Sequence, residues 1–182
     1  MKELSLNILD ITQNSISANA SLVTVSVIKD SKSNLLTLSI EDNGKGMSED
    51  FLRNVCDPFT TTRTTRKVGM GIPLLKMAAE QAGGKFEIKS EVGVGTVVLA
   101  TFQLDNIDRI PLGDVGQTMS ALASCNEHVD FIYRHTADGQ EFCFDTKEIK
   151  EALGGVPLNE PDVVIWMQEY IREGIQSING GV

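Results

Sequence analysis

Segment 40–47 constrains the fold most, because a strand-like run ends there in a carboxylate and two alternating glycines. Its sequence is Ile-Glu-Asp-Asn-Gly-Lys-Gly-Met. The runs Leu22–Lys29 and Leu35–Glu41 are rich in β-branched and aliphatic residues, which predicts a hairpin. The carboxylate of Asp42 can accept a hydrogen bond from an exocyclic amine, and glycines let the backbone approach a flat ring. Adenine carries such an amine, whereas guanine presents an acceptor. The segment therefore predicts an adenine site, with an ordinary Asp-Asn-Gly turn as the alternative.

Patterns on both sides of this hairpin predict one sheet that is covered by helices on one face. Apolar residues recur at helical spacing through Leu4–Ala18. Ser48 can cap a short helix that runs through about Val55, and a helix that begins near Ile72 stops at the Gly83-Gly84 pair. Two further strands are expected over Lys85–Ser90 and Thr96–Leu104, joined by the turn Gly93-Val94-Gly95.

The residue pattern of the sequence changes after residue 104. Residues 105–116 contain Pro111 and Gly113 in a polar context, which indicates a linker between a first unit, 1–104, and a small α+β unit, 117–182. The second unit is expected to contain helices over Met119–Cys125, Thr146–Leu153 and Pro161–Ile175, and a hairpin of Val129–Arg134 and Glu141–Phe144 about Asp138-Gly139.

Charge is divided unevenly between these units. The formal net charge of −9 belongs to residues 105–182, since residues 1–104 hold equal numbers of acidic and basic side chains. Such a segment repels nucleic-acid phosphates and anionic lipid, so we expect neither a nucleic-acid nor a membrane partner. It either keeps the protein in solution or recognises a basic partner. No apolar run approaches the roughly 20 residues of a membrane span and no secretion signal is recognised, so a cytoplasmic protein is expected.

The first predicted helix carries a polar stripe of Asn7, Asp10, Asn14 and Ser17 at spacings of three and four. Side chains at this spacing share one face, so a ligand that lies along the helix meets amide and carboxylate groups together. The alternative is a solvated helix face.

Hydroxyls and cations in residues 57–67 lead into Val68-Gly69-Met70-Gly71 at the start of a helix. Free backbone N–H groups and the helix dipole favour an anion there, and a polyphosphate fits this pattern. Farther on, Gly95-Thr96 opens a strand and is expected to place the Thr96 hydroxyl beside the Asp42 carboxylate; alone, it is only a hairpin turn.

In this order and spacing, the four segments resemble the GHKL (Bergerat-fold) ATPase superfamily, and specifically the histidine-kinase-like ATP-binding domain, over residues 1–104. Leu9–Ala20 resembles the N box, Ile40–Met47 the first glycine box, and Asp57–Arg63 the phenylalanine box at the start of the ATP lid. The resemblance implies an α/β (α+β) two-layer sandwich with a mixed, mainly antiparallel sheet and helices on one face.

The resemblance also implies ATP or ADP with Mg²⁺ as cofactors, with Asn14 as the metal ligand and Asp42 as the adenine-reading residue. The implied cofactor-binding set is Asn14, Ser17, Asp42, Gly44, Gly46, Met47, Phe59, Thr60, Thr61, Thr62, Arg63, Lys67, Val68, Gly69, Met70, Gly71 and Thr96.

Several positions depart from the family pattern. Asp10 stands where hydrolytic members have a glutamate that acts as general base, and its side chain is one methylene shorter. Lys67 replaces a glycine of the second glycine box. Ser17 replaces a phosphate-contacting lysine, so we expect Arg63, Arg66 or Lys67 to supply that charge.

Two functions fit the resemblance, which is strongest to stand-alone anti-sigma-type kinases. In the first, an Mg-ATP-dependent kinase or ATPase hydrolyses ATP or transfers its γ-phosphate to a separate protein partner. In the second, a nucleotide-gated interaction module has little or no catalysis. His128 and His135 are interpreted as surface or packing residues rather than phosphoacceptors. A homodimer is compatible with either function.

Overall fold

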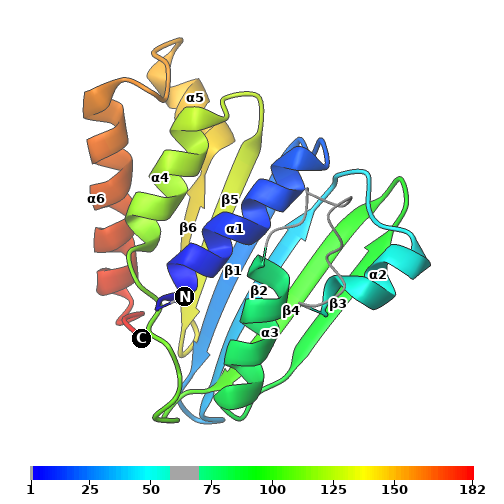
Figure 1. Ribbon diagram of the computed structural model, residues 1–182. Helices are drawn as coiled ribbons and strands as arrows, with labels where there is room; N and C mark the ends of the chain where they lie inside the picture. The colour runs from blue at the N-terminus through cyan, green and yellow to red at the C-terminus, as the bar shows by residue number, and fades with distance from the viewer. Residues whose placement is uncertain (1, 58–69) are drawn as a thin grey trace.

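The computed structural model describes residues 2–57 and 70–182 and contains one six-stranded sheet in the order β3-β4-β2-β1-β5-β6 (Figure 1). All neighbouring strands are antiparallel except β1 and β5, which are parallel. This confirms the mixed, mainly antiparallel sheet. The strands are β1 (Leu22–Asp30), β2 (Leu35–Asp42), β3 (Phe86–Glu91), β4 (Gly95–Gln103), β5 (Asp130–Ala137) and β6 (Gln140–Asp145).

Helices α1, α3 and α4 lie side by side across one face of this sheet, and α6 lies at its β6 end (Figure 1). The two-layer architecture is therefore confirmed. The helices are α1 (Leu4–Ser17), α2 (Glu49–Val55), α3 (Gly71–Gln81), α4 (Val115–Cys125), α5 (Thr146–Leu153) and α6 (Pro161–Ser177). Among the described residues, no helix is both long and apolar enough to cross a membrane.

Alternation of side chains in the central strands creates the core between the two layers. Through the middle of β1, β2 and β4, every second residue is buried beneath the helices, because successive side chains of a strand point to opposite faces. Helix α1 contributes Leu4, Ile8 and Ile11, which are the apolar residues that the helical spacing predicts. The buried strand residues are Val23, Val25, Val27, Leu36, Leu38, Ile40, Val98, Ala100 and Phe102.

The C-terminal region extends the same sheet, since β5 pairs with β1 from Leu22↔Asp130 to Lys29↔Ala137. The predicted linker 105–116 therefore does not separate two cores. The backbone N–H groups of Leu4 and Ser5 donate to the carbonyls of Pro111 and Leu112, which ties this segment to α1. Sequence patterns did not reveal this join, because a parallel pair of strands has no hairpin turn between its members.

Helix α4 also begins four residues before the predicted start, at Val115. The cause is Asp114, whose carboxylate accepts a hydrogen bond from the backbone N–H of Gln117 and caps the helix. The other helix and strand boundaries lie within three residues of their predicted positions.

A histidine is buried in this C-terminal extension. His135 of β5 is fully buried, and its Nδ1 lies 2.6 Å from the hydroxyl of Tyr133. Its other ring nitrogen, Nε2, lies against Gly180, where an added Cβ would be only 2.6 Å away. Burial lowers the pKa of His135 to about 4. His135 therefore acts as a packing residue, whereas His128 is exposed.

Stability is expected to fall as the pH decreases from about 6.5 toward 4. The pKa of His135 is about 4 in the folded state and near 6.5 in the unfolded chain, so protonation favours unfolding across this window. The loss reaches at most about 3.5 kcal/mol, since each unit of pKa is worth about 1.4 kcal/mol. Urea unfolding of His135→Gln at several pH values measures the effect, with His128→Gln as the matched control. An identical pH slope in wild type and His135→Gln would contradict the assignment.

Candidate functional site

Asp42 ends β2 with its carboxylate on the helix side of the sheet, as expected from its alternation with the buried Ile40. Its Oδ2 accepts a hydrogen bond of 2.6 Å from the hydroxyl of Ser15 on α1. Its Oδ1 accepts a hydrogen bond of 2.8 Å from the backbone N–H of Gly44. The carboxylate is thus fixed in one orientation at the boundary between the helix layer and the sheet.

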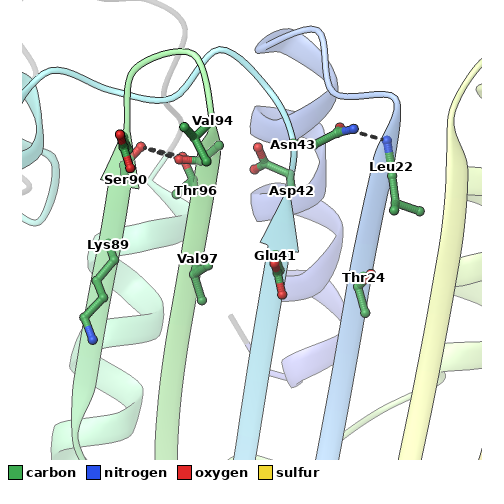
Figure 2. Close-up of a pocket in the computed structure, with 12 residues that line it drawn as sticks. Leu22, Thr24, Glu41, Asp42, Asn43, Lys89, Ser90, Val94, Thr96 and Val97 are labelled. Atoms are coloured by element: carbon green, nitrogen blue, oxygen red, sulfur yellow. Dashed lines mark hydrogen bonds between the residues drawn. The ribbon is translucent and has the colours of Figure 1, made fainter.

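Asn43 fixes the turn that follows. Its side-chain oxygen accepts hydrogen bonds from the backbone N–H groups of Ser21 and Leu22, at 2.9 and 3.0 Å, where β1 begins (Figure 2). The turn after β2 is therefore attached to the neighbouring strand, which limits how far Asp42 can move.

The glycines of the site are required by contacts within the protein. An added Cβ at Gly44 would lie 2.8 Å from the carbonyl oxygen of Ala18, and one at Gly46 would lie 2.0 Å from that of Glu91. An added Cβ at Gly95 would lie 1.9 Å from the carbonyl oxygen of Asp42, and Gly95 has a φ of 145°. We predicted that the glycines would make room for a flat ring; what the structure shows is that they let three backbone segments meet.

Thr96 lies directly opposite Asp42 in the register of β2 and β4, as Figure 2 shows. Its hydroxyl lies 2.8 Å from the hydroxyl of Ser90, which in turn accepts a hydrogen bond from the backbone N–H of Met47. Thr96 thus lies across from Asp42, while its hydroxyl contacts Ser90, and the hydrogen bonds of the Asp42 carboxylate come from Ser15 and Gly44. Thr96 and the half-buried Met47 are nevertheless brought to the same end of the sheet.

The predicted polar stripe of α1 runs from the core to the surface. Asn7 is only 1% exposed, and neither atom of its amide has a partner among the described residues. Asp10 and Asn14 are half-buried, and Ser17 is exposed. The buried Nδ2 of Asn14 also has no described partner. The stripe is therefore not simply a solvated face.

The start of α3 lies against the middle of α1. An added Cβ at Gly71 would be 2.9 Å from the Cβ of Asp10, so these two helices are in close contact here. Met70 is exposed and precedes the first turn of α3, whose N–H groups lack partners within the helix. The remaining predicted lid residues lie outside the described part of the chain: Phe59, Thr60, Thr61, Thr62, Arg63, Lys67, Val68 and Gly69.

A pocket of about 390 Å³ opens at the same end of the sheet (Figure 2). Most of its lining comes from side chains that alternate to the face opposite the helices, among them Thr24, Glu41 and Val97. Asp42 and Thr96 also line this pocket. Because the Asp42 carboxylate is hydrogen-bonded to Ser15 of helix α1, we place the candidate nucleotide site on the helix side of the sheet.

Ser15, Asn43 and Ser90 are the site residues that sequence reasoning missed. Ser15 had a readable signal, because it follows Ile11 by four positions and so interrupts the apolar row of α1. A hydroxyl in a core-facing row needs a partner, and Asp42 supplies it. Ser90 had no comparable signal in the sequence.

A helix layer over a mixed sheet, with Asp42 at a strand end and Asn14 on the first helix, is the arrangement expected of an ATPase-type domain. The family model described as "Histidine kinase-, DNA gyrase B-, and HSP90-like ATPase" matches residues 1–106. The chain therefore belongs to this family.

Several curated relatives of the chain are sensor proteins. The chain is 39% identical over 64 residues to the C4-dicarboxylate transport sensor protein DctB of Pseudomonas aeruginosa, covering 35% of this chain and 10% of that protein. It is 36% identical over 67 residues to the sensor protein SrrB of Staphylococcus aureus, covering 34% and 12%. The match thus spans about a tenth of the length of these relatives.

Among solved structures, the chain is similar to the Aquifex aeolicus MutL ATPase domain complexed with ADP. The TM-score is 0.54 at 15% identity, over 85% of this chain and 70% of the other. At this identity the comparison shows the fold alone. Its coverage exceeds residues 1–106, so the shared fold includes part of the C-terminal extension.

Ser15→Ala is expected to destabilise the fold by about 1–2 kcal/mol, because a half-buried carboxylate loses a charge-assisted hydrogen bond. The midpoint of urea unfolding measures this loss. Ser17→Ala, on the exposed side of the same helix, is the matched control and should change stability by less than about 0.5 kcal/mol. Equal effects of the two substitutions would show that the Ser15–Asp42 contact contributes nothing.

Proposed function

We propose that the chain binds Mg-ATP on the helix side of the sheet and hydrolyses it or passes its γ-phosphate to a separate protein. The observation that carries this proposal is the orientation of Asp42. Ser15 and Gly44 each donate to one of its oxygens, and an ionised carboxylate has about four acceptor positions. The remaining positions suit the exocyclic amine of adenine.

Asn14 is the proposed Mg²⁺ ligand. Its amide is half-buried on α1, and one of its atoms has no partner among the described residues. No group of three acidic, histidine or cysteine side chains suited to a metal occurs in the described part of the chain. Mg²⁺ usually takes one or two protein oxygens and completes its shell with phosphates and water, so the side-chain oxygen of Asn14 can suffice. When bound, the ion would neutralise charge on the phosphates.

The phosphates are proposed to lie between α1 and the first turn of α3. The N–H groups at this helix start and the helix dipole favour an anion, and the close contact of Gly71 with Asp10 brings them near the carboxylate. We further propose that the hydroxyls and cations of the predicted lid, 57–67, complete the phosphate site.

Asp10 is the proposed general base. It lies beside the helix start at Gly71 and can accept a proton from water or from an acceptor hydroxyl that attacks the γ-phosphate. The partner protein is proposed by analogy with the sensor proteins to which the chain is similar. A nucleotide-gated module without catalysis is the competing function, favoured by the short reach of this side chain.

Asp42→Asn is expected to weaken ATP binding at least about thirtyfold, because the charge is lost and an amide N–H then opposes the adenine amine. Calorimetry with saturating Mg²⁺ measures the affinity. Glu41→Gln is the matched control, since Glu41 is exposed and alternates to the other face of the sheet. Absence of heat for adenosine nucleotides with the wild-type chain would refute the whole proposal.

Asp10→Asn is expected to leave ATP affinity within about threefold of wild type while γ-phosphate loss falls at least about a hundredfold. Release and transfer of labelled γ-phosphate measure the catalytic step, and the affinity serves as internal control. Asp10→Glu tests reach, since one added methylene should speed turnover if distance limits it. Unchanged trace turnover in Asp10→Asn would favour the binding module.

A further inference from the structure

The outer side of α6 carries large aromatic side chains that the core does not cover. Trp166 and Tyr170 are 46% and 39% exposed, and their rings stack with centroids 5.0 Å apart and 12° between planes. Phe142 of β6 meets Tyr170 edge to face at 5.3 Å. We call Phe142, Trp166 and Tyr170 the aromatic patch. It lies at the β6 end of the sheet, away from the strand end that holds Asp42 (Figure 1).

The packing of α6 explains why the patch faces outward. Val163, Met167 and Ile171 are buried at a spacing of four and form the row that contacts the core. Trp166 and Tyr170 each precede a member of this row by one position, which turns them about 100° away from it. They are therefore not needed to fill the core.

The patch is also held in a fixed shape. Gly174 faces the ring of Phe142 so closely that an added Cβ would lie 2.2 Å from it. Phe142 therefore packs directly on the α6 backbone, and its edge-to-face contact with Tyr170 holds that ring in place. An ordered aromatic surface loses little conformational entropy on binding, which is why Trp and Tyr are common where partners dock.

Acidic side chains border the aromatic patch. Asp162, Glu169 and Glu173 are exposed on the same helix, and no ion pair of the described residues includes them. The basic side chain of α6, Arg172, is bound by Asp114, and this hydrogen bond raises the pKa of the guanidinium. The charge that remains around the patch is negative.

We propose that the aromatic patch and its acidic border form a docking surface for a cationic segment of a partner protein that carries Lys or Arg beside an apolar side chain. Aromatic faces attract cations, and the bordering carboxylates complement the same charge. Nucleic acid and anionic lipid are disfavoured by that border. The surface needs no nucleotide, so it does not rest on the proposed ATP chemistry.

The single tryptophan of the chain is Trp166, so fluorescence excited selectively from tryptophan reports on this surface alone. The probe is a synthetic amphipathic peptide of Lys, Leu and Ala, with a twin in which Glu replaces every Lys. The Lys peptide should shift the emission saturably and bind about tenfold more weakly at high salt. The Glu twin should produce no shift. Binding of both peptides alike would overturn the proposal.

Substitutions can separate the contribution of the aromatic patch to peptide binding from that of the surrounding negative charge. Tyr170→Ala keeps the fluorophore and should weaken the Lys peptide about tenfold, as should the double change Glu169→Lys and Glu173→Lys. Met77→Ala, at an exposed apolar position of α3, is the control and should leave the affinity unchanged. Thermal unfolding checks that each variant folds, and a Tyr170→Ala chain that folds and binds normally would overturn the proposal.

Two further probes test the partner's chemistry. Oligolysine without apolar residues should bind at least about tenfold more weakly than the Lys peptide, because it cannot fill the aromatic surface. Equal binding would mean that only the acidity matters and would overturn the aromatic assignment. Anionic phospholipid vesicles should leave the emission unchanged, and a shift would overturn the assignment to a protein partner.

Discussion

Close backbone contact among three turns holds the candidate site together. The backbone N–H of Lys45 donates to the carbonyl of Ala18, and the N–H of Gly93 donates to the carbonyl of Lys45, both at 2.8 Å. The end of α1, the end of β2 and the β3–β4 turn thus meet around one residue. Gly46 and Gly95 permit this approach because a side chain at either position would overlap a carbonyl. The orientation of Asp42 depends on this junction.

Most of the fold could be predicted from local patterns. The amphipathic period of α1, the cap at Ser48 and the Gly83-Gly84 stop are signals that the nearest residues determine, and the structure confirms them. The joining of β5 to β1 could not be predicted, since it depends on contacts between residues more than 100 positions apart. Hydrophobic periodicity specifies which face is buried but not which strand lies alongside.

The site was predictable where its residues fall in family-like motifs, as for Asp42 at its strand end and for Gly71 at the start of α3. Support from Ser15 was not predicted, because its place in the apolar row of α1 indicates that it needs a partner but not which distant residue supplies it. The predicted role of the glycines was incomplete, since it considered only the space that an adenine ring needs. Their contacts with Ala18 and Glu91 show that the protein itself also requires them.

The parallel pairing of β1 and β5 has a consequence for dissecting the molecule. The family match ends at residue 106, yet β1 is an interior strand only because β5 lies beside it. A chain shortened to that limit would expose a full row of unpaired N–H and C=O groups along β1. Such an edge pairs with strands from other molecules, so we expect the isolated ATPase-like portion to self-associate. In the full chain, the acidic C-terminal part covers this edge of β1 with β5.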